Sequence, residues 1–206
     1  MDVGYLPDRG MSGWAATSRP GRRHGALARH ADVMSTQRYL VLHDYGMGGL
    51  WWWIRARSVR EVRETFAQVE VVDDPAAVAR AEGWNLDEVD IDTATPPAGL
   101  NELRATRDKQ RALPGFGALA DKQVLFLRQV WDGDEPATYL MEIGPDGRLV
   151  RQVEVAEDGT GIKTDSEDWP LNPPMVDLFD PQLPNQEIDR EEFERAWAAA
   201  RWEDGR

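Results

Sequence analysis

The spacing of apolar and polar positions divides the chain into regions of different character. Residues 1–33 show neither the two-residue period of a strand nor the period of about 3.6 residues of a helix. From Arg38 to about Leu113, short apolar runs alternate with amphipathic segments, and from Gln123 to Thr164 apolar runs follow one another directly. We therefore predict four parts: a disordered or wrongly annotated extension before a true start at Met34 (1–33), an α/β unit (34–95), a linker with a charged helix (96–122) and a C-terminal module (123–206).

The α/β unit begins with the signals of a β-hairpin. The runs 39–43 and 50–54 consist mainly of large apolar residues and flank the glycine-rich stretch 46–49. Glycine supplies the positive φ angles that tight turns need. A phosphate-binding loop would need a lysine and a helix after these glycines, and a run of tryptophans follows instead. We predict a hairpin turn.

Helices are expected after the hairpin. Ser58 with Glu61 forms a capping box, and Asp74 followed by proline is a second helix start. A short β-branched strand over 69–72 separates the two helices, and a charged helix follows over about 100–113.

The C-terminal module has the pattern of an antiparallel meander. Four strands are predicted over 123–131, 137–143, 148–156 and 160–164, and each of the three connections contains Asp-Gly, a strong hairpin signal. Asp189 with Glu192 forms another capping box, so a helix is expected to cover the sheet. The predicted fold class is α+β: an N-terminal β-hairpin with helices, then a four-stranded antiparallel meander covered by a C-terminal helix.

Part of this module resembles a known family. The matching motifs are Asp134-Glu135-Pro136 before a strand, Tyr139-Leu140-Met141-Glu142, the segment 150–155, and the closing helix from Glu187 to Trp197. Over 134–202 the chain resembles a family of small bacterial proteins that form a domain of unknown function. The family's tryptophan-histidine pair is only half present, since Asp132 follows Trp131. The resemblance implies a meander with a closing helix and carries no activity.

Negative charge is concentrated in the last third of the chain. Residues 132–206 hold seven basic and 20 acidic residues, so they account for the whole formal net charge of −13. Such a surface repels nucleic-acid phosphates and attracts cationic partners. We predict that this third docks a basic protein and binds no nucleic acid. The alternative is that the acidic surface only keeps the protein soluble.

The residue inventory excludes several classes of protein. The chain has no cysteine, which excludes disulfides, thiolate metal sites and cysteine nucleophiles. No apolar run approaches the roughly 20 residues that span a bilayer, and the first residues lack a secretion signal. We predict a cytoplasmic protein that is not associated with a membrane.

Two acidic clusters are the candidates for contacting a partner: Asp132, Asp134 and Glu135, and Asp165, Glu167 and Asp168. A calcium loop starting at Asp132 would need glycine at its sixth position and glutamate at its twelfth, where the chain has Ala137 and Ile143. We therefore predict neither a metal ion nor a cofactor, and the alternative for these carboxylates is a solvated surface.

The tryptophan triplet 51–53 is the rarest local feature. In a strand, Trp51 and Trp53 share one face with Arg55 and Arg57. Apolar residues on both faces favour a central strand that is covered on both sides. The alternative is a groove that stacks a base, a sugar or a peptide aromatic group and pairs with an anion.

His43 is the only histidine after residue 33. Adjacent strand residues point to opposite faces, so Asp44 does not orient His43 as a general base. A structural histidine at the end of a strand is the favoured interpretation, and a ligand contact beside the tryptophan face is the alternative.

These observations favour a non-catalytic protein-binding module with an acidic docking surface. Small acidic bacterial proteins without catalytic motifs act as adaptors or neutralise toxins, and this role is expected here by analogy. The alternative is a small-molecule-binding enzyme or sensor that uses Trp51, Trp53, Arg55, Arg57 and His43. A structural module with no separable ligand is the third hypothesis.

Overall fold

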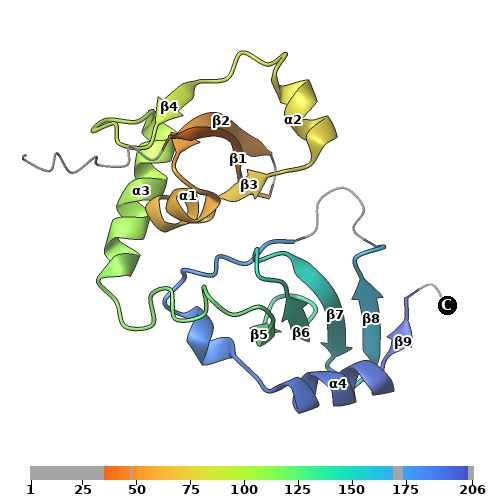
Figure 1. Cartoon of the computed structure of the whole chain (residues 1–206). Helices are drawn as coiled ribbons and strands as arrows, with labels where there is room; N and C mark the ends of the chain where they lie inside the picture. The colour runs from red at the N-terminus through yellow and green to blue at the C-terminus, as the bar shows by residue number, and fades with distance from the viewer. Residues whose placement is uncertain (1–34, 47, 169–173, 204–206) are drawn as a thin grey trace, which may run out of the picture. The chain divides into compact units, whose positions relative to one another are not determined.

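The computed structural model describes residues 35–46, 48–168 and 174–203, which belong to one compact unit, Met34–Arg206. The N-terminal extension predicted over 1–33 lies outside the described residues. The described chain has an α+β fold with two separate β-sheets, each accompanied by helices (Figure 1). The predicted fold class is therefore confirmed.

The first sheet is built on the predicted hairpin and has the strand order β3-β1-β2-β4. β1 and β2 pair antiparallel along their whole length, and Gly46 with a φ of +84° shapes the turn between them. β3 adds antiparallel to β1, and β4 adds parallel to β2. The strands are β1 (Gln37–Asp44), β2 (Gly49–Ala56), β3 (Glu70–Val72) and β4 (Glu88–Asp90).

Three helices accompany this sheet, and two of them start at the predicted caps. They are α1 (Val59–Thr65), α2 (Pro75–Ala81) and α3 (Ala98–Arg111). The Ser58 hydroxyl accepts a hydrogen bond from the Glu61 N–H at 3.1 Å, and the Asp74 carboxylate accepts one from the Ala77 N–H at 2.7 Å. These side chains satisfy backbone donors that the first helical turn leaves without a partner.

Both faces of the first sheet are covered. One face forms the larger core, in which Trp52 and Ile54 pack with Val62 and Phe66 and with Leu100 of α3. The other face forms a smaller core under α2: Leu40, Trp53 and Ala81, with Trp51, Val72, Val78 and Leu86 at its margin. β2 is therefore a central strand with apolar side chains buried on both sides.

The second sheet is the predicted meander with one additional short strand. Figure 1 shows β5 to β8 side by side, with α4 lying against them. The strand order β5-β6-β7-β8-β9 is antiparallel as far as β8, and β9 then pairs parallel to β8. The strands are β5 (Leu125–Trp131), β6 (Ala137–Ile143), β7 (Leu149–Ala156), β8 (Gly161–Asp165) and β9 (Arg201–Trp202).

The two faces of the second sheet are covered differently. α4 (Arg190–Ala199) begins at Asp189, whose carboxylate accepts the Glu192 N–H at 2.7 Å, and places Phe193 against Phe126, Leu140 and Val153. The opposite face packs at one end against Leu119, Leu178 and Leu183, the last of these in the short 3₁₀ helix η1 (Leu183–Gln186).

A buried ion pair links α3 to the segment that precedes η1. The fully buried Arg107 donates to both oxygens of Asp177 at 2.8 Å and to the carbonyl of Phe66 at 3.0 Å. Asp177 also accepts the Gln68 N–H at 3.0 Å. Because a buried charge is costly unless it is paired and hydrogen-bonded, this network depends on each of its members.

Candidate functional site

The meander brings two acidic turns to the same end of the second sheet. Trp131, Ala137 and Ala156 stand opposite one another on β5, β6 and β7, so the β5–β6 and β7–β8 turns both begin at this row. Their carboxylates belong to exposed residues: Asp132, Asp134 and Glu135 in the first turn, Glu157 and Asp158 in the second. We call these five carboxylates, with Trp131 and Tyr139, the acidic end.

None of the five carboxylates forms an ion pair with another residue in the described part of the chain. The basic residues of the neighbouring strands contact other groups. Arg128 pairs with Glu192, Arg151 with Glu142 and Glu194, and Lys163 donates to the Trp197 carbonyl at 3.2 Å. These three cations lie on the face that α4 covers, so they do not compensate the negative charge of the acidic end.

The opposite face carries a row of partly exposed side chains beside the acidic end. Gln129, Tyr139, Glu154 and Ile162 stand opposite one another on four successive strands, so they project on the same side of the sheet. Gln129 is exposed and the other three are half-buried. This row therefore extends the acidic end across the sheet.

Trp131 is the most conspicuous apolar group of the acidic end. Its side chain is 55% exposed, and the preceding Val130 is 67% exposed. A Cβ at Gly133 would lie 2.5 Å from the Trp131 Nε1, so the glycine makes room for the indole ring above the turn. A large aromatic ring held on the surface next to carboxylates suits contact with cationic groups, since a cation is attracted to the face of an indole.

The electrostatic effect of the acidic end is visible at Tyr139. Partial burial raises the pKa of the Tyr139 hydroxyl above its ordinary value, and the negative charges of Glu154 and Glu135 raise that pKa further. At Asp158 the pKa of the carboxyl is lowered, because it accepts hydrogen bonds from Thr160, whose N–H lies 2.8 Å away. Asp158 therefore remains ionised at neutral pH.

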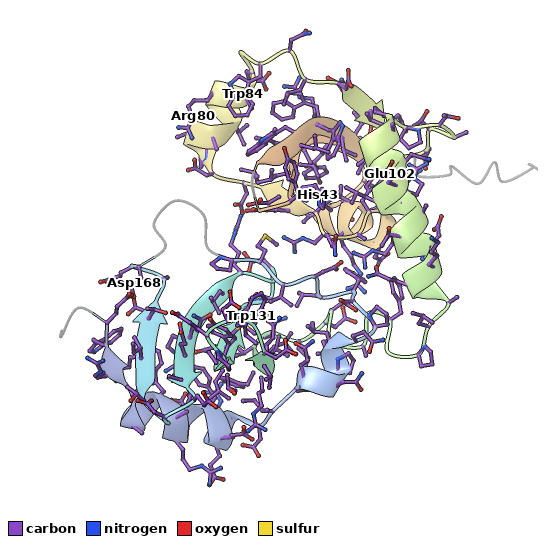
Figure 2. The ribbon with its side chains drawn as sticks, turned by 180° about the vertical axis from the view of Figure 1, so that it is seen from behind. His43, Arg80, Trp84, Glu102, Trp131 and Asp168 are labelled. Carbon is purple, nitrogen blue, oxygen red and sulfur yellow. The ribbon has the colours of Figure 1, made fainter. Side chains whose placement is uncertain are left out.

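The second predicted cluster lies elsewhere. Asp165 ends β8 opposite Arg151, at the end of the strand far from the acidic end, and Glu167 and Asp168 follow it. The Asp168 carboxylate accepts the Asp165 N–H at 2.8 Å, and Asp165 accepts the Glu167 N–H at 3.0 Å. Figure 2 labels Asp168 and Trp131 at separate places on the second sheet. The structure therefore does not bring the two predicted clusters together.

The face of β2 that carries Trp51 and Trp53 forms a small core. Trp53 is only 5% exposed and packs with Leu40 and Ala81, while the Arg38 guanidinium lies 3.9 Å from the centre of its ring. Trp51 is half-buried and meets Trp84 edge-on at 5.3 Å; Trp84 follows α2 (Figure 2). The side chains of this face stabilise the contact between sheet and helix.

The remaining predicted ligand residues also have partners within the protein. Arg55 pairs with Glu88, and Arg57 pairs with both Glu61 and Asp92. The His43 Nδ1 lies 2.9 Å from the Gln68 carbonyl oxygen, which can only accept, so Nδ1 carries the proton. These contacts anchor loops and strand ends of the first sheet.

A cleft of about 490 Å³ lies beside β1 and the segment 174–180, and four carboxylates line it. All four have structural partners: Asp44 accepts the Gly46 N–H, Glu70 pairs with Arg148, Asp177 with Arg107, and Asp180 accepts the Gln182 N–H. Across the described ranges, no group of three or more histidine, aspartate or glutamate residues is arranged to hold a metal ion. The four carboxylates of this cleft therefore serve contacts within the protein.

Sequence reasoning named Asp132, Asp134 and Glu135 as partner-binding candidates, but it did not assign that role to the other members of the acidic end: Trp131, Tyr139, Glu157 and Asp158. The signal was present in the meander itself, because the first and third turns of a four-stranded meander lie at the same end of the sheet. The edge position of β5 could not be deduced in the same way, since it depends on which later segments add to the sheet.

No protein-family model, curated protein or solved structure matches this chain. Within the part of the chain that the structure describes, the helices are too short or too polar to cross a membrane.

Proposed function

We propose that this chain is a non-catalytic protein-binding module whose acidic end docks a basic segment of a partner protein. The observation that carries the proposal is the grouping of five exposed carboxylates, which form no ion pair among the described residues, around the exposed Trp131. On the face that α4 covers, by contrast, Arg128 and Arg151 form ion pairs with carboxylates of this helix.

The chemistry of the acidic end favours a polypeptide with arginine or lysine side chains. Uncompensated carboxylates attract cations over about a Debye length, which accelerates association at low ionic strength. At contact, a guanidinium can form bidentate hydrogen bonds with a carboxylate and stack on the Trp131 ring. Nucleic acids are disfavoured, because their phosphates are repelled by the same charges. An adaptor role, or the neutralisation of a basic toxin, is consistent with this chemistry.

The small-molecule alternative receives less support. It requires an accessible face of Trp51 and Trp53, whereas Trp53 is buried under Arg38 and α2. Arg55 and Arg57 would have to exchange their intramolecular carboxylates for those of a ligand.

The proposal is tested with a labelled synthetic peptide that alternates arginine with valine, followed by fluorescence anisotropy. The variant Asp132→Asn/Asp134→Asn/Glu135→Gln is expected to bind the peptide about tenfold more weakly, which corresponds to a loss of about 1.4 kcal/mol in binding free energy. Raising the salt from about 50 to about 200 mM is expected to weaken wild-type binding several-fold. A peptide that alternates glutamate with valine is expected not to bind.

The matched control is Asp165→Asn/Glu167→Gln/Asp168→Asn, which makes the same change of net charge at the other end of β8. This control is expected to bind the arginine peptide within about twofold of wild type. If both triple variants lose affinity equally, binding depends on net charge alone and the acidic end is not the site. If the arginine peptide does not bind the wild-type protein, the proposal is wrong.

A further inference from the structure

β5 is an edge strand, and the described residues cover only part of its outer side. Along its first half, the chain's own segment after η1 adds as a short antiparallel pairing. Leu127 stands opposite Glu187, and the Ile188 N–H donates to the Phe126 carbonyl at 2.9 Å. No described strand pairs with the outer side of β5 beyond this point, from Arg128 to Trp131. The outer edge of β5 therefore extends beyond Leu127, where the pairing with the segment after η1 ends.

The backbone groups of this free edge have a definite direction. In an antiparallel sheet, the N–H and C=O of one residue point to the same side, and the side alternates along the strand. The Phe126 carbonyl points outward to Ile188, so the backbone groups of Arg128 and Val130 point outward as well. The side chain of Val130 is 67% exposed, in keeping with an open edge at this residue.

The side chains around the free edge leave it accessible. Natural sheets protect their edges with charged residues, and Arg128 is the only such residue in this stretch. The Arg128 guanidinium is turned to Glu192 of α4. The acidic turn, Asp132 to Glu135, begins directly after Trp131. An extended segment lying along Val130 would therefore reach the carboxylates of the acidic end with its own side chains.

We infer that the residues Arg128–Trp131 take up the basic segment of the partner as an additional β-strand, paired through the backbone of Val130. This inference rests on the proposed function and specifies its binding mode. The occupant is an extended, positively charged polypeptide, because the edge offers backbone donors and acceptors while the adjoining turn offers only negative charge. The backbone pairing holds the segment in place, and the carboxylates with Trp131 select basic side chains.

The test compares two substitutions at one position, with the arginine–valine peptide as the probe. Val130→Pro removes the outward N–H donor and is tolerated at an edge, because that group does not pair with β6. We expect it to weaken peptide binding about tenfold. Val130→Ala keeps the backbone donor and is expected to stay within about threefold of wild type. Amide hydrogen exchange at Val130 is expected to slow when the peptide binds to the wild-type protein.

A second arm changes the peptide instead of the protein, so that the test does not depend on how Val130→Pro folds. An arginine–valine peptide N-methylated at every residue keeps its charge but has no backbone N–H with which to pair as a strand. It is expected to bind at least about tenfold more weakly than the unmodified peptide. If Val130→Pro and the methylated peptide both bind normally while Asp132→Asn/Asp134→Asn/Glu135→Gln still weakens binding, strand addition is wrong and the proposed function stands.

A second copy of this chain is the other possible occupant of an open edge. Sedimentation of the wild-type protein without peptide is expected to show a monomer. A dimer that Val130→Pro converts to a monomer would overturn the inference in favour of self-association. If the wild-type protein does not bind the arginine–valine peptide at all, the proposed function is wrong as well.

Discussion

Tryptophans occur on both sheets, and their surroundings differ. The triplet Trp51–Trp53 lies on β2, which has a neighbouring strand on each side and packed side chains on both faces. Trp131 ends β5, which is the edge of its sheet, and projects beyond the packed part of its face. The comparison shows that the position of a strand in its sheet decides whether an aromatic side chain stabilises the fold or remains available for contact.

Arginines next to the two regions differ in the same way. Around β2, Arg38 lies over Trp53, and Arg55 and Arg57 each have carboxylate partners. The arginine charges and the Trp53 ring therefore already have partners inside the protein. Around the acidic end, carboxylates and the Trp131 ring are present without a cation from the described residues. A partner's basic side chain would supply the missing component.

The largest expected effect separates the two tryptophan sites by stability. Trp53→Ala removes a side chain that is 5% exposed and leaves a cavity under α2, so the free energy of unfolding should fall by about 4 kcal/mol. Trp131→Ala removes a ring that is 55% exposed and should cost less than about 0.5 kcal/mol. Urea denaturation followed by circular dichroism measures both values. Equal losses would mean that Trp131 is part of the core, as Trp53 is.

Much of the fold could be predicted because its signals are local. The caps at Ser58, Asp74 and Asp189 depend on side chains that reach backbone groups only three residues away, and each forms the expected hydrogen bond. The hairpin turns depend on glycine and on Asp-Gly pairs. These features depend on residues that are close together in the sequence, so they can be predicted without knowing which segments pack against them.

The features that could not be predicted depend on distant residues. β4 has three residues and β9 has two, and each is a strand only because a remote strand pairs with it. Arg107 appears in the sequence as one basic residue of a charged helix, yet its side chain is fully buried and forms an ion pair with Asp177. Trp131 is exposed because β5 lies at an edge, which also follows from tertiary structure. Tertiary contacts therefore decided the site more than local pattern did.

The distinction between buried and exposed regions extends to the carboxylates. Asp177→Asn leaves the fully buried Arg107 without its counter-charge, so the free energy of unfolding should fall by about 3 kcal/mol. Asp134→Asn is the same chemical change on the exposed β5–β6 turn and should alter stability by no more than about 0.5 kcal/mol. Chemical denaturation of both variants makes the comparison. A large loss in Asp134→Asn would show that the acidic end holds a structural ion pair.

The smallest expected effect concerns the field at the acidic end, for which Tyr139 is the reporter. Burial and the neighbouring Glu154 and Glu135 raise the pKa of Tyr139, because the phenolate loses hydration and is repelled by the carboxylates. Removing a negative charge must therefore lower this pKa, so Glu154→Gln should shift the titration of Tyr139 to lower pH. NMR of ring-labelled tyrosine measures the shift, with Tyr139→Phe identifying the signal among the four tyrosines.

The same titration distinguishes a local field from the general charge of the chain. Glu191→Gln on α4 removes an equal charge from the far face of the second sheet and should leave the pKa of Tyr139 nearly unchanged. A bound arginine–valine peptide brings positive charge to the acidic end and should lower the pKa of Tyr139, as Glu154→Gln does. If the peptide binds while the pKa of Tyr139 does not change, the arginine side chains of the peptide contact another part of the protein.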